Sequence, residues 1–356
     1  MALFLFAGVT QAQQTVFMVV TGEGESQTST PYTTLDLAVK GAAAGSTIYL
    51  PTGSFDVEAT EQTIGGANRA YTLFINKKLK LIGAGVDGGA LHSTVINGDI
   101  AITGAASGTV LEGISLAYTA LGGYMRGAFH VNNVDVFIKR CKIGGEMALS
   151  GTGDVVISES HIATINGKST FYGGNGLSDM AVVAQNTVIT GNIGYVHNSL
   201  FTNNVIGTYS IYDVHSSTFS NNIFTYVGNI NPSSYSTYNS YTYNVLVANF
   251  DAVTAGSYCT VEDNIPSNTL AEIFEGGTAA EAAAREYRLN PEGPAKVNAE
   301  GNPPGSDGTE IGLYGGLGYK GVRTPSNPSV TKFSVGGTTN PDGLLKANIV
   351  VDAQEK

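Results

Sequence analysis

The run DVFIKRCKIGG, residues 135–145, shows the repeating pattern of this chain most clearly. Its apolar residues alternate with other residues as far as Ile138 and then resume out of phase at Cys141. A single β-strand alternates strictly between its two faces, so this slip indicates a bend between two short strands. We place the polar Arg140 at that corner.

The same unit recurs between residues 79 and 265. Aligned on their last large apolar residue, the runs repeat at a spacing of about 19–27 residues, which suits one turn of a parallel β-helix. The aligned residues, predicted to point into one continuous core, are Leu116, Ile143, Ile162, Leu200, Phe219, Val245 and Ile265. The residues predicted at the corner are Arg140, Glu159, His197, Ser216, Thr242 and Glu262.

Asparagine pairs also recur, at residues 203–204 and 221–222. Asparagine tolerates a left-handed backbone and can stack on its own kind between neighbouring turns of a solenoid. These pairs therefore favour the same repeating corner.

The residue pattern changes at the two ends of the repeat. Thr33 and Thr34 precede an apolar pattern that predicts a short helix ending at Gly45, and Thr278 with Glu281 has the capping-box spacing for a helix over residues 278–288. The tail alternates around a Gly/Asn/Pro turn, which is typical of a β-hairpin.

We therefore predict an all-β fold, a right-handed parallel β-helix (a single-stranded solenoid) with a short N-terminal capping helix and a C-terminal β-hairpin tail. The predicted division is a signal peptide remnant at 1–12, a β-helix domain at 13–325 with an N-terminal cap (15–57) and a C-terminal closing segment (266–325), and a hairpin tail at 326–356.

Composition bounds the function. The chain carries 46 glycines, only 13% charged residues, no tryptophan and a formal net charge of -11. Nucleic acid requires clustered Lys and Arg, so we expect no nucleic-acid partner. No run approaches about 18 continuous apolar residues, so we expect no transmembrane segment.

The N-terminus reads as a secretory signal. An apolar stretch from Ala2 to Val9 leads to small residues that predict cleavage after Ala12. We therefore expect a secreted, periplasmic or cell-surface location. Two cysteines, Cys141 and Cys259, are too few for a disulfide framework, and we predict that both are buried free thiols.

Three segments carry a family resemblance. Residues 32–57 (YTTLDLAVKGAAAGSTIYLPTGSFDV) look like the N-terminal cap of secreted pectin-lyase-like β-helix proteins. Residues 286–301 (EYRLNPEGPAKVNAEG) and 308–316 (GTEIGLYGG) resemble segments that close the β-helix in secreted Bacteroidetes proteins of the right-handed β-helix repeat class. The resemblance covers about residues 15–345 and implies fold and caps, but little about activity, since enzymes, lectin-like surfaces and structural fibres share this scaffold.

The resemblance also raises enzymatic hypotheses. Pectate lyases of this fold bind calcium through clustered acids, so Ca²⁺ is expected only if the protein is a lyase. Here the acids are thinly spread, and neither a paired Asp-Asp nor a Gly-His-Gly occurs. A carboxylate pair such as Asp135 with Asp154 stays open for a hydrolase. No spacing of His and Cys predicts a metal site.

One charged patch is a weak catalytic candidate. Lys142 and His161 are predicted to point outward on adjacent turns, flanked by Arg140 and Glu159 at the corner. Such a group could bind a uronate or act as acid and base. The alternative is a solvated face in which Arg140 forms a salt bridge over Glu159.

A tyrosine cluster is the candidate sugar-binding surface. A tyrosine offers a flat apolar ring and a hydroxyl, on which sugar rings stack. The candidates are Tyr226, Tyr235, Tyr238, Tyr241 and Tyr243, with Tyr258 nearby. The alternative is a structural tyrosine stack filling the sheet surface.

These observations favour an extracytoplasmic protein with a glycan-binding or cell-surface role, whose partner is a polysaccharide or surface glycan. We identify no complete catalytic motif and no cofactor, so an enzyme is the less favoured hypothesis. The alternatives are a polysaccharide lyase or glycoside hydrolase acting on an acidic or complex polysaccharide, and a structural or adhesive surface protein.

Overall fold

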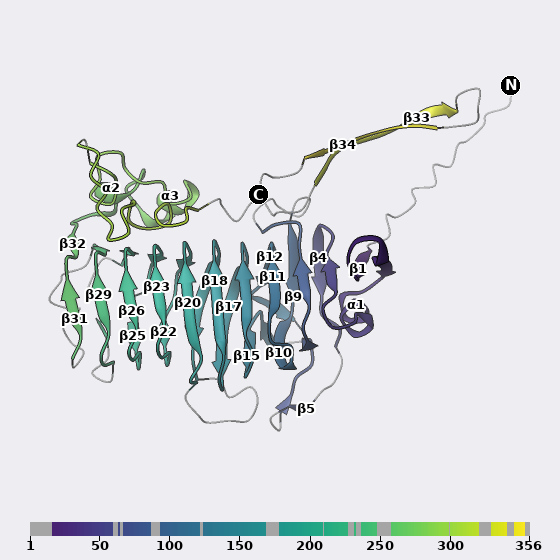
Figure 1. Ribbon diagram of the computed structural model, residues 1–356, viewed down its shortest axis with the longest axis horizontal. Coiled ribbons are helices and arrows are strands. Elements are labelled where there is room, and N and C mark those ends of the chain that lie inside the picture. The colour runs from purple at the N-terminus through teal and green to yellow at the C-terminus, as the bar shows by residue number, and fades with distance from the viewer. Residues whose placement is uncertain are drawn as a thin grey trace.

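The computed structural model is rich in β-strand, and its long sheets are parallel (Figure 1). The structure describes residues 16–59, 63–64, 67–86, 93–121, 124–168, 178–208, 210–226, 231–232, 236–247, 258–298, 300–319, 329–339 and 345–352. The predicted signal peptide at 1–12 lies outside the described residues.

Three stacks of strands, named here faces 1, 2 and 3, build the solenoid-like body. Face 1 is parallel except where β1 pairs antiparallel with β2 and β3. In spatial order its strands are β2 (Thr28–Tyr32), β1 (Phe17–Thr21), β3 (Thr47–Tyr49), β8 (Lys80–Ile82), β11 (Thr109–Glu112), β16 (Val136–Lys139), β18 (Asp154–Ser158), β20 (Ala181–Gln185), β23 (Leu200–Thr202), β26 (Thr218–Ser220), β29 (Ser240–Thr242) and β31 (Thr260–Glu262).

Faces 2 and 3 are parallel and share two long strands that bend from one face into the other. Face 2 consists of β4 (Gly53–Asp56), β9 (Thr94–Asn97), β12 (Ile114–Ala117), β17 (Lys142–Ser150), β19 (His161–Asn166), β21 (Val188–Ile189), β24 (Val205–Ile206), β27 (Ile223–Phe224), β30 (Val245–Leu246) and β32 (Ile265–Pro266). Face 3 consists of β7 (Thr72–Lys77), β10 (Asp99–Ala105), β15 (Phe129–Asn132), the later parts of β17 and β19, β22 (Ile193–Gly194), β25 (Ser210–Tyr212) and β28 (Asn231–Pro232).

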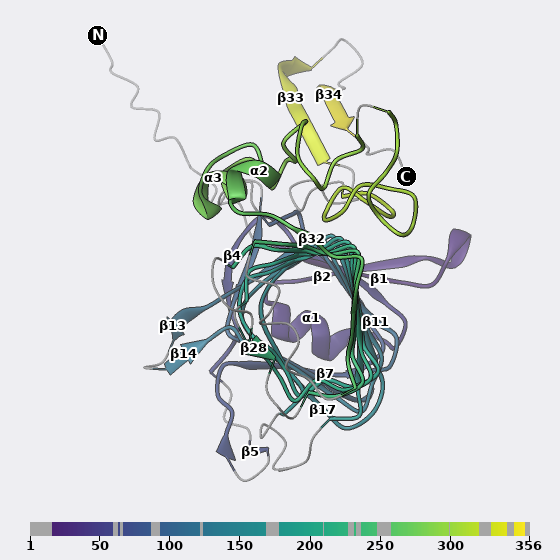
Figure 2. The ribbon, with the colours of Figure 1, turned by 90° about the vertical axis from the view of Figure 1, so that its left-hand side faces the viewer.

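Viewed along the stack, successive strands superpose around a common interior (Figure 2). On face 2, Leu116, Ile143 and Ile162 are in register and buried, as predicted. On face 1, the aromatic rings of Phe201, Phe219 and Tyr241 stack inside at centroid distances of 4.6 and 4.9 Å. Apolar burial of such continuous columns is the main stabilising contribution in a stacked fold.

The predicted single core series is wrong at Leu200, Val245 and Ile265, whereas Phe219 lies in the core as predicted. Leu200 is 37% exposed, because its neighbour Phe201 is the residue that points inward on face 1. Val245 is buried, but on the outer side of face 2, in a second apolar cluster beneath the C-terminal segment. Ile265 packs against that second cluster as well. A strand that is covered on both sides carries apolar residues on both sides. An alignment on the last large apolar residue of each run therefore combined inward-pointing with outward-pointing residues.

The corner between faces 1 and 2 is a ladder of left-handed residues. Arg140 (φ 50°) and Glu159 (φ 48°) occupy it, as predicted, and later turns place asparagine there, including Asn203 and Asn221. Thr242 and Glu262 instead end face 1 strands, and His197 and Ser216 lie at a different corner, before the face 1 strands.

The second asparagine of each predicted pair forms a buried ladder. The Nδ2 of Asn204 donates to the Oδ1 of Asn222 at 2.9 Å, and Asn222 donates to Asn244 at 3.0 Å. Each Nδ2 also donates to a backbone carbonyl, so these buried amides are paired along the stack.

The first helix, α1 (Leu35–Gly41), begins at Thr34, whose hydroxyl accepts a hydrogen bond from the Leu37 N–H. It buries Leu35, Ala38 and Val39 in the interior cluster. A short 3₁₀ turn, η1 (Gly24–Ser26), precedes it.

The C-terminal segment (residues 266–319) contains α2 (Leu270–Ile273) and α3 (Ala279–Ala284), the latter with the predicted capping box. It packs beside face 2 and runs back along the stack. The Gly312 N–H donates to Asn221 O at 2.9 Å, and the Asn186 Nδ2 donates to Leu313 O at 2.8 Å. It therefore covers the outer side of the last turns, which explains the second apolar cluster.

Antiparallel hairpins complete the described structure. They are β5 (Thr63–Ile64) with β6 (Ala67–Asn68), β13 (Thr119–Leu121) with β14 (Tyr124–Arg126), and β33 (Ser329–Thr339) with β34 (Leu345–Asp352). The last pair agrees with the predicted hairpin in the tail. In the described part of the chain, no helix is long and apolar enough to cross a membrane.

Both cysteines are free, as predicted. Cys141 is buried, whereas Cys259 is only half-buried, contrary to the prediction. Each lies at a corner where neighbouring turns place a polar side chain: the Cys141 N–H donates to Ser160 Oγ, and the Asn239 N–H donates to Cys259 Sγ.

Candidate functional site

The predicted charged patch assembles only in part. Lys142 and His161 are neighbours in register on the outer side of face 2, as predicted. Lys142 is exposed, while His161 Nε2 lies 3.1 Å from the hydroxyl of Tyr319, at the far end of the C-terminal segment. This contact engages the imidazole that was expected to face a substrate.

The other two members of the patch lie at the corner. Arg140 is buried and donates from Nη2 to Glu112 Oε1 at 2.6 Å, a partner that the sequence prediction did not include. The carboxylate of Glu159 lies 3.7 Å from Lys139 Nζ. A guanidinium buried in an ion pair offers little to a ligand on the surface.

The predicted tyrosine surface is also divided. Tyr241 is only 2% exposed and stacks on Phe219 in the core, so its assignment as a sugar-binding residue is wrong. Along each strand of face 1, successive side chains point alternately inward and outward. Tyr241 occupies an inward position in register with Phe219.

Two tyrosines form an exposed stack. The rings of Tyr238 and Tyr258 lie 5.0 Å apart at 8°, with exposures of 61% and 77%. Tyr243 lies at the left-handed corner, where the charge of Asp263 and a hydrogen bond to it raise the pKa of the phenol. Tyr226 lines a cavity beside face 2, and Tyr235 lies outside the described residues.

The cavity at Tyr226 is largely apolar and has a volume of about 420 Å³. It lies between the outer side of face 2, with Val188 and Val205, and the helices α2 and α3, with Phe274 and Ala282. Tyr226 is therefore separated from the exposed stack and does not extend it.

Of the carboxylate pair considered for a hydrolase, Asp135 with Asp154, the Asp135 carboxylate has a structural role. The Asp135 carboxylate accepts hydrogen bonds from the Asp154 N–H at 3.0 Å and the Ser107 hydroxyl at 2.7 Å. These hydrogen bonds lower the pKa of Asp135. An acid held ionised in this way is poorly suited to donate a proton.

A second charged group, not predicted from the sequence, lies on the outer side of face 3. Asp99 begins β10 and is almost fully buried there. One oxygen of its carboxylate pairs with the Arg126 guanidinium at 3.0 Å, and the other accepts the N–H groups of Gly127 and Ala128 at 2.9 and 3.0 Å. These contacts hold Arg126 over the sheet.

His130 lies beside this ion pair. Phe129 and Val131 point into the core, so His130 between them points outward. Burial lowers the pKa of His130 to about 3, and the positive charges of Arg69 and Arg126 contribute to the shift. The imidazole is therefore neutral at physiological pH, next to two guanidinium groups.

A continuous column of outward residues leads away from this histidine. It passes from His130 through Ala148, Asn166 and Gly194 to Tyr212, one residue from each successive turn. At Gly194 an added Cβ would overlap the Tyr212 ring, so the glycine allows that ring to lie close to the sheet. The column thus has the charged group at one end and aromatic rings at the other, with the buried Ala148 and Gly194 between them.

The aromatic end is extended by two neighbours. The rings of Tyr212 and Tyr195 meet edge to face at 5.1 Å, and Lys168 Nζ lies 5.0 Å from the Tyr195 ring centre. Burial raises the pKa of Tyr212, with smaller contributions from Tyr195 and Glu146. Glu146, whose own pKa is raised by burial, accepts a hydrogen bond from Asn166.

The sequence repeat carries little signal for this group. Arg69 and Arg126 belong to connections outside the repeating runs, and an alignment of the runs discards them. The available signal was the alternation in FHVN (residues 129–132), which places His130 on the outer side of a buried strand.

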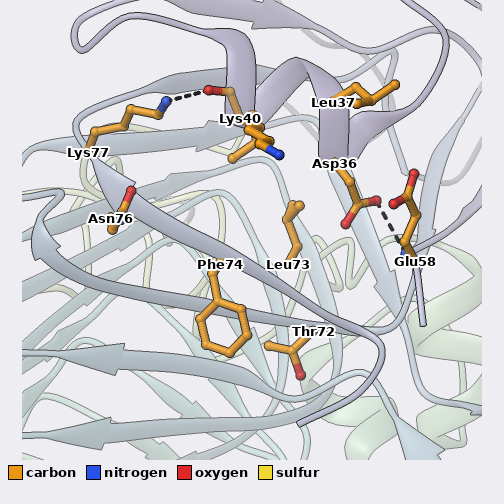
Figure 3. Close-up of a pocket in the computed structure, with 10 residues that line it drawn as sticks. Asp36, Leu37, Lys40, Glu58, Thr72, Leu73, Phe74, Asn76 and Lys77 are labelled. Carbon is orange, nitrogen blue, oxygen red and sulfur yellow. Dashed lines mark hydrogen bonds between the residues drawn. The ribbon is translucent and has the colours of Figure 1, made fainter. Parts of the chain in front are cut away.

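A cavity of about 540 Å³ lies at the start of face 3, between α1 and β7 (Figure 3). Asp36 and Glu58 stand side by side at one end of it, and Lys77 lies at the other. The Lys77 ammonium donates to the carbonyl oxygens of Lys40 and Ala42 at 3.0 and 2.7 Å, which ties β7 to the C-terminus of α1. Burial raises the pKa of Asp36, and the charge of Glu58 raises it further.

Within the described ranges, no three His, Cys, Asp or Glu side chains gather as metal ligands. The fold and these sites define a parallel β-rich, solenoid-like protein with a charged and aromatic column on one face. No protein-family model, curated protein or solved structure matches the chain.

Proposed function

We propose that the chain is a right-handed parallel β-helix of the pectin-lyase-like class, exported from the cell, with α1 as its N-terminal cap. The three parallel faces around a shared apolar interior support this assignment. So does the placement of Leu35, Ala38 and Val39 from α1 within that interior cluster.

We further propose that the protein binds an anionic polysaccharide, of the uronate-bearing kind, along the face 3 column. The observation that carries the proposal is the half-buried Arg69, whose positive charge acts on His130 at one end of a column that ends at Tyr212. Arg126 is paired with Asp99 beside it. Guanidinium pairs well with carboxylate, and a tyrosine ring suits a sugar face.

The dimensions of the column favour a polymer over a single sugar. His130 and Tyr212 are separated by four steps between adjacent strands, or about 19 Å at the usual strand spacing. Ala148 and Gly194 are buried, so the half-buried His130, Asn166 and Tyr212 are the positions of the column that a polymer would contact. Contacts at these positions would then add along one glycan chain.

The low pKa of the His130 imidazole favours a binding role over a catalytic one. A general base works best when its pKa lies near the working pH, and a histidine with a pKa of about 3 is a weak base at neutral pH. The second candidate function is a polysaccharide lyase. It rests on the same residues, with a neutral imidazole beside guanidinium groups that would neutralise a uronate.

The test is retention in affinity electrophoresis on gels containing polygalacturonate, a sulfated polysaccharide or neutral dextran. Arg69→Gln and Tyr212→Ala should each weaken retention on polygalacturonate by about tenfold, the loss expected for one charge-assisted or stacking contact. Added salt should weaken the wild-type interaction, because ion pairs with the polymer are screened.

Matched controls lie elsewhere on the surface. Arg285→Gln removes an exposed guanidinium at the end of α3, and Tyr258→Ala removes an exposed ring from the Tyr238 stack. Both should retain the polymer as the wild type does. Loss of retention in Tyr258→Ala alone would move the binding surface to the tyrosine stack. Retention on dextran alone would overturn the anionic specificity, and release of unsaturated uronate products would establish the lyase.

A further inference from the structure

The apolar cavity between the outer side of face 2 and the helices α2 and α3 is large for a packing gap. Its volume is about 420 Å³. Protein interiors leave few voids larger than a water molecule, and a void of about 150 Å³ already holds benzene. Small-molecule sites occupy roughly 300–1,000 Å³. The cavity is therefore large enough for a molecule of two or three rings.

The floor of the cavity consists of outward-pointing residues of face 2. Ile189 and Ile206 are in register and point into the core, so the residues on either side of each point outward. Val188 and Val205 are such residues, and both are buried beneath the C-terminal segment. They form the buried end of the floor.

Gly207 leaves room at the other end of this floor. A Cβ added to Gly207 would make only ordinary van der Waals contacts, the nearest with Thr225 Oγ1 at 3.5 Å. Thr190 and Thr225 line the cavity from the neighbouring turns. Because Thr190 is exposed and Gly207 and Thr225 are half-buried, the threonine hydroxyls lie at the end of the cavity nearest the solvent.

The roof of the cavity is held in place by its own contacts. Phe274, at the end of α2, is 1% exposed, and its ring meets the Tyr287 ring edge to face at 5.6 Å. The Glu275 N–H donates to Arg288 O at 2.9 Å, and the Tyr287 N–H donates to Ala282 O at 2.7 Å. These bonds tie α2 and α3 to the segment that follows them, so the roof keeps its shape without a ligand.

The lining of the cavity is uncharged. None of the described residues that line it is Asp, Glu, Lys, Arg or His. Burial raises the pKa of the Tyr287 phenol, which is therefore neutral at physiological pH. A charged ligand would lose its hydration here without gaining a counter-charge, and a sugar would leave most of its hydroxyls unpaired. The lining therefore favours an uncharged, mostly apolar ligand.

We propose that this cavity binds an uncharged aromatic small molecule, with its rings against Phe274 and one hydrogen-bonding group toward the hydroxyls of Thr190 and Thr225. The rings of Phe274 and Tyr287 offer both faces and edges, which aromatic ligands pack against favourably. The site lies on face 2 and is independent of glycan binding on the outer side of face 3.

The experiment uses the full chain and the probe N-phenyl-1-naphthylamine, an uncharged aromatic amine whose fluorescence rises in apolar surroundings. Titration should show saturable binding of one probe molecule per chain. The related 1-anilinonaphthalene-8-sulfonate has the same rings and a negative charge, and it should bind at least about tenfold more weakly because the cavity offers no counter-charge. Equal or tighter binding of the sulfonate, or no saturable binding of the amine, would overturn the proposal.

Substitutions locate the bound probe. Gly207→Leu places a side chain in the floor of the cavity and should weaken binding of the amine by at least about tenfold. Ala279→Leu fills the cavity from α3, and the matched control is Ala280→Leu, since Ala280 is exposed and does not line the cavity. Ala279→Leu should weaken binding and Ala280→Leu should leave it unchanged, with thermal unfolding confirming that each variant is folded. If Gly207→Leu does not fold, the Ala279 and Ala280 pair decides the question. Equal binding by that pair would place the probe elsewhere and overturn the proposal.

Discussion

Arg140 and Glu112 form a buried ion pair at the corner between faces 1 and 2, with 2.6 Å between Nη2 and Oε1 and side-chain exposures of 6% and 8%. Glu112 ends β11 and Arg140 follows β16, the neighbouring strand of face 1. The pair therefore links successive turns of the stack at the point where the chain bends. A charge in such a place is tolerated because its partner is buried with it.

Removal of one partner should be costly. Glu112→Gln leaves the Arg140 guanidinium buried without its counter-charge, and we expect the free energy of unfolding to fall by about 3–5 kcal/mol. Urea unfolding followed by circular dichroism would measure it. The matched surface change is Lys139→Ala, which breaks a 3.7 Å pair with a 45% exposed ammonium. It should cost less than about 1 kcal/mol, and similar losses for both variants would contradict the assignment.

His130 should make stability depend on pH. Its pKa is about 3 in the folded protein, well below the ordinary value of 6.5, so between these values the unfolded chain binds a proton that the folded chain does not. Stability should therefore fall as the pH is lowered from about 6.5 toward 3. His130→Gln removes this contribution and should flatten the melting temperature against pH over that window. Parallel curves for variant and wild type would contradict the assignment.

Substitution of the buried tyrosine should destabilise the protein far more than substitution of an exposed one. Tyr241→Ala empties a fully buried position in the aromatic stack and should lower the free energy of unfolding by about 3–5 kcal/mol. Tyr238→Ala removes a 61% exposed ring and should cost less than about 1 kcal/mol. Thermal unfolding of both variants would test this. A large loss for Tyr238→Ala would mean that the exposed stack is structural.

The two thiols should react at different rates. Burial raises the pKa of Cys141 to about 12, and a buried thiol without thiolate character is inert. Cys259 is half-buried. A maleimide should therefore label Cys259 in the native protein and both thiols in denaturant, as read by mass spectrometry. Labelling of Cys141 first, or a mass consistent with a disulfide, would contradict this picture.

The strand-and-corner unit could be derived from local pattern, because a phase slip in apolar alternation has one simple cause. Arg140 and Glu159 lie at the expected corner, and Lys142 and His161 are neighbours as expected. The inward direction of the later turns could not be derived in the same way. Leu200 and Val245 are apolar on the outer sides of their strands, and local pattern carries no information on what covers an outer side.

Local sequence was enough to predict the parallel strand-rich fold, the short capping motifs at Thr34 and Thr278, the asparagine ladder and the free state of the cysteines. These follow from alternation, residue propensity and spacing, which act over a few residues. Three relationships became visible only in the folded chain: Arg140 pairs with Glu112, Tyr241 lies in the core, and Arg69 and Arg126 lie near His130 on face 3. Those groups are brought together by stacking of turns and by connections outside the repeat, so their proximity depends on long-range packing.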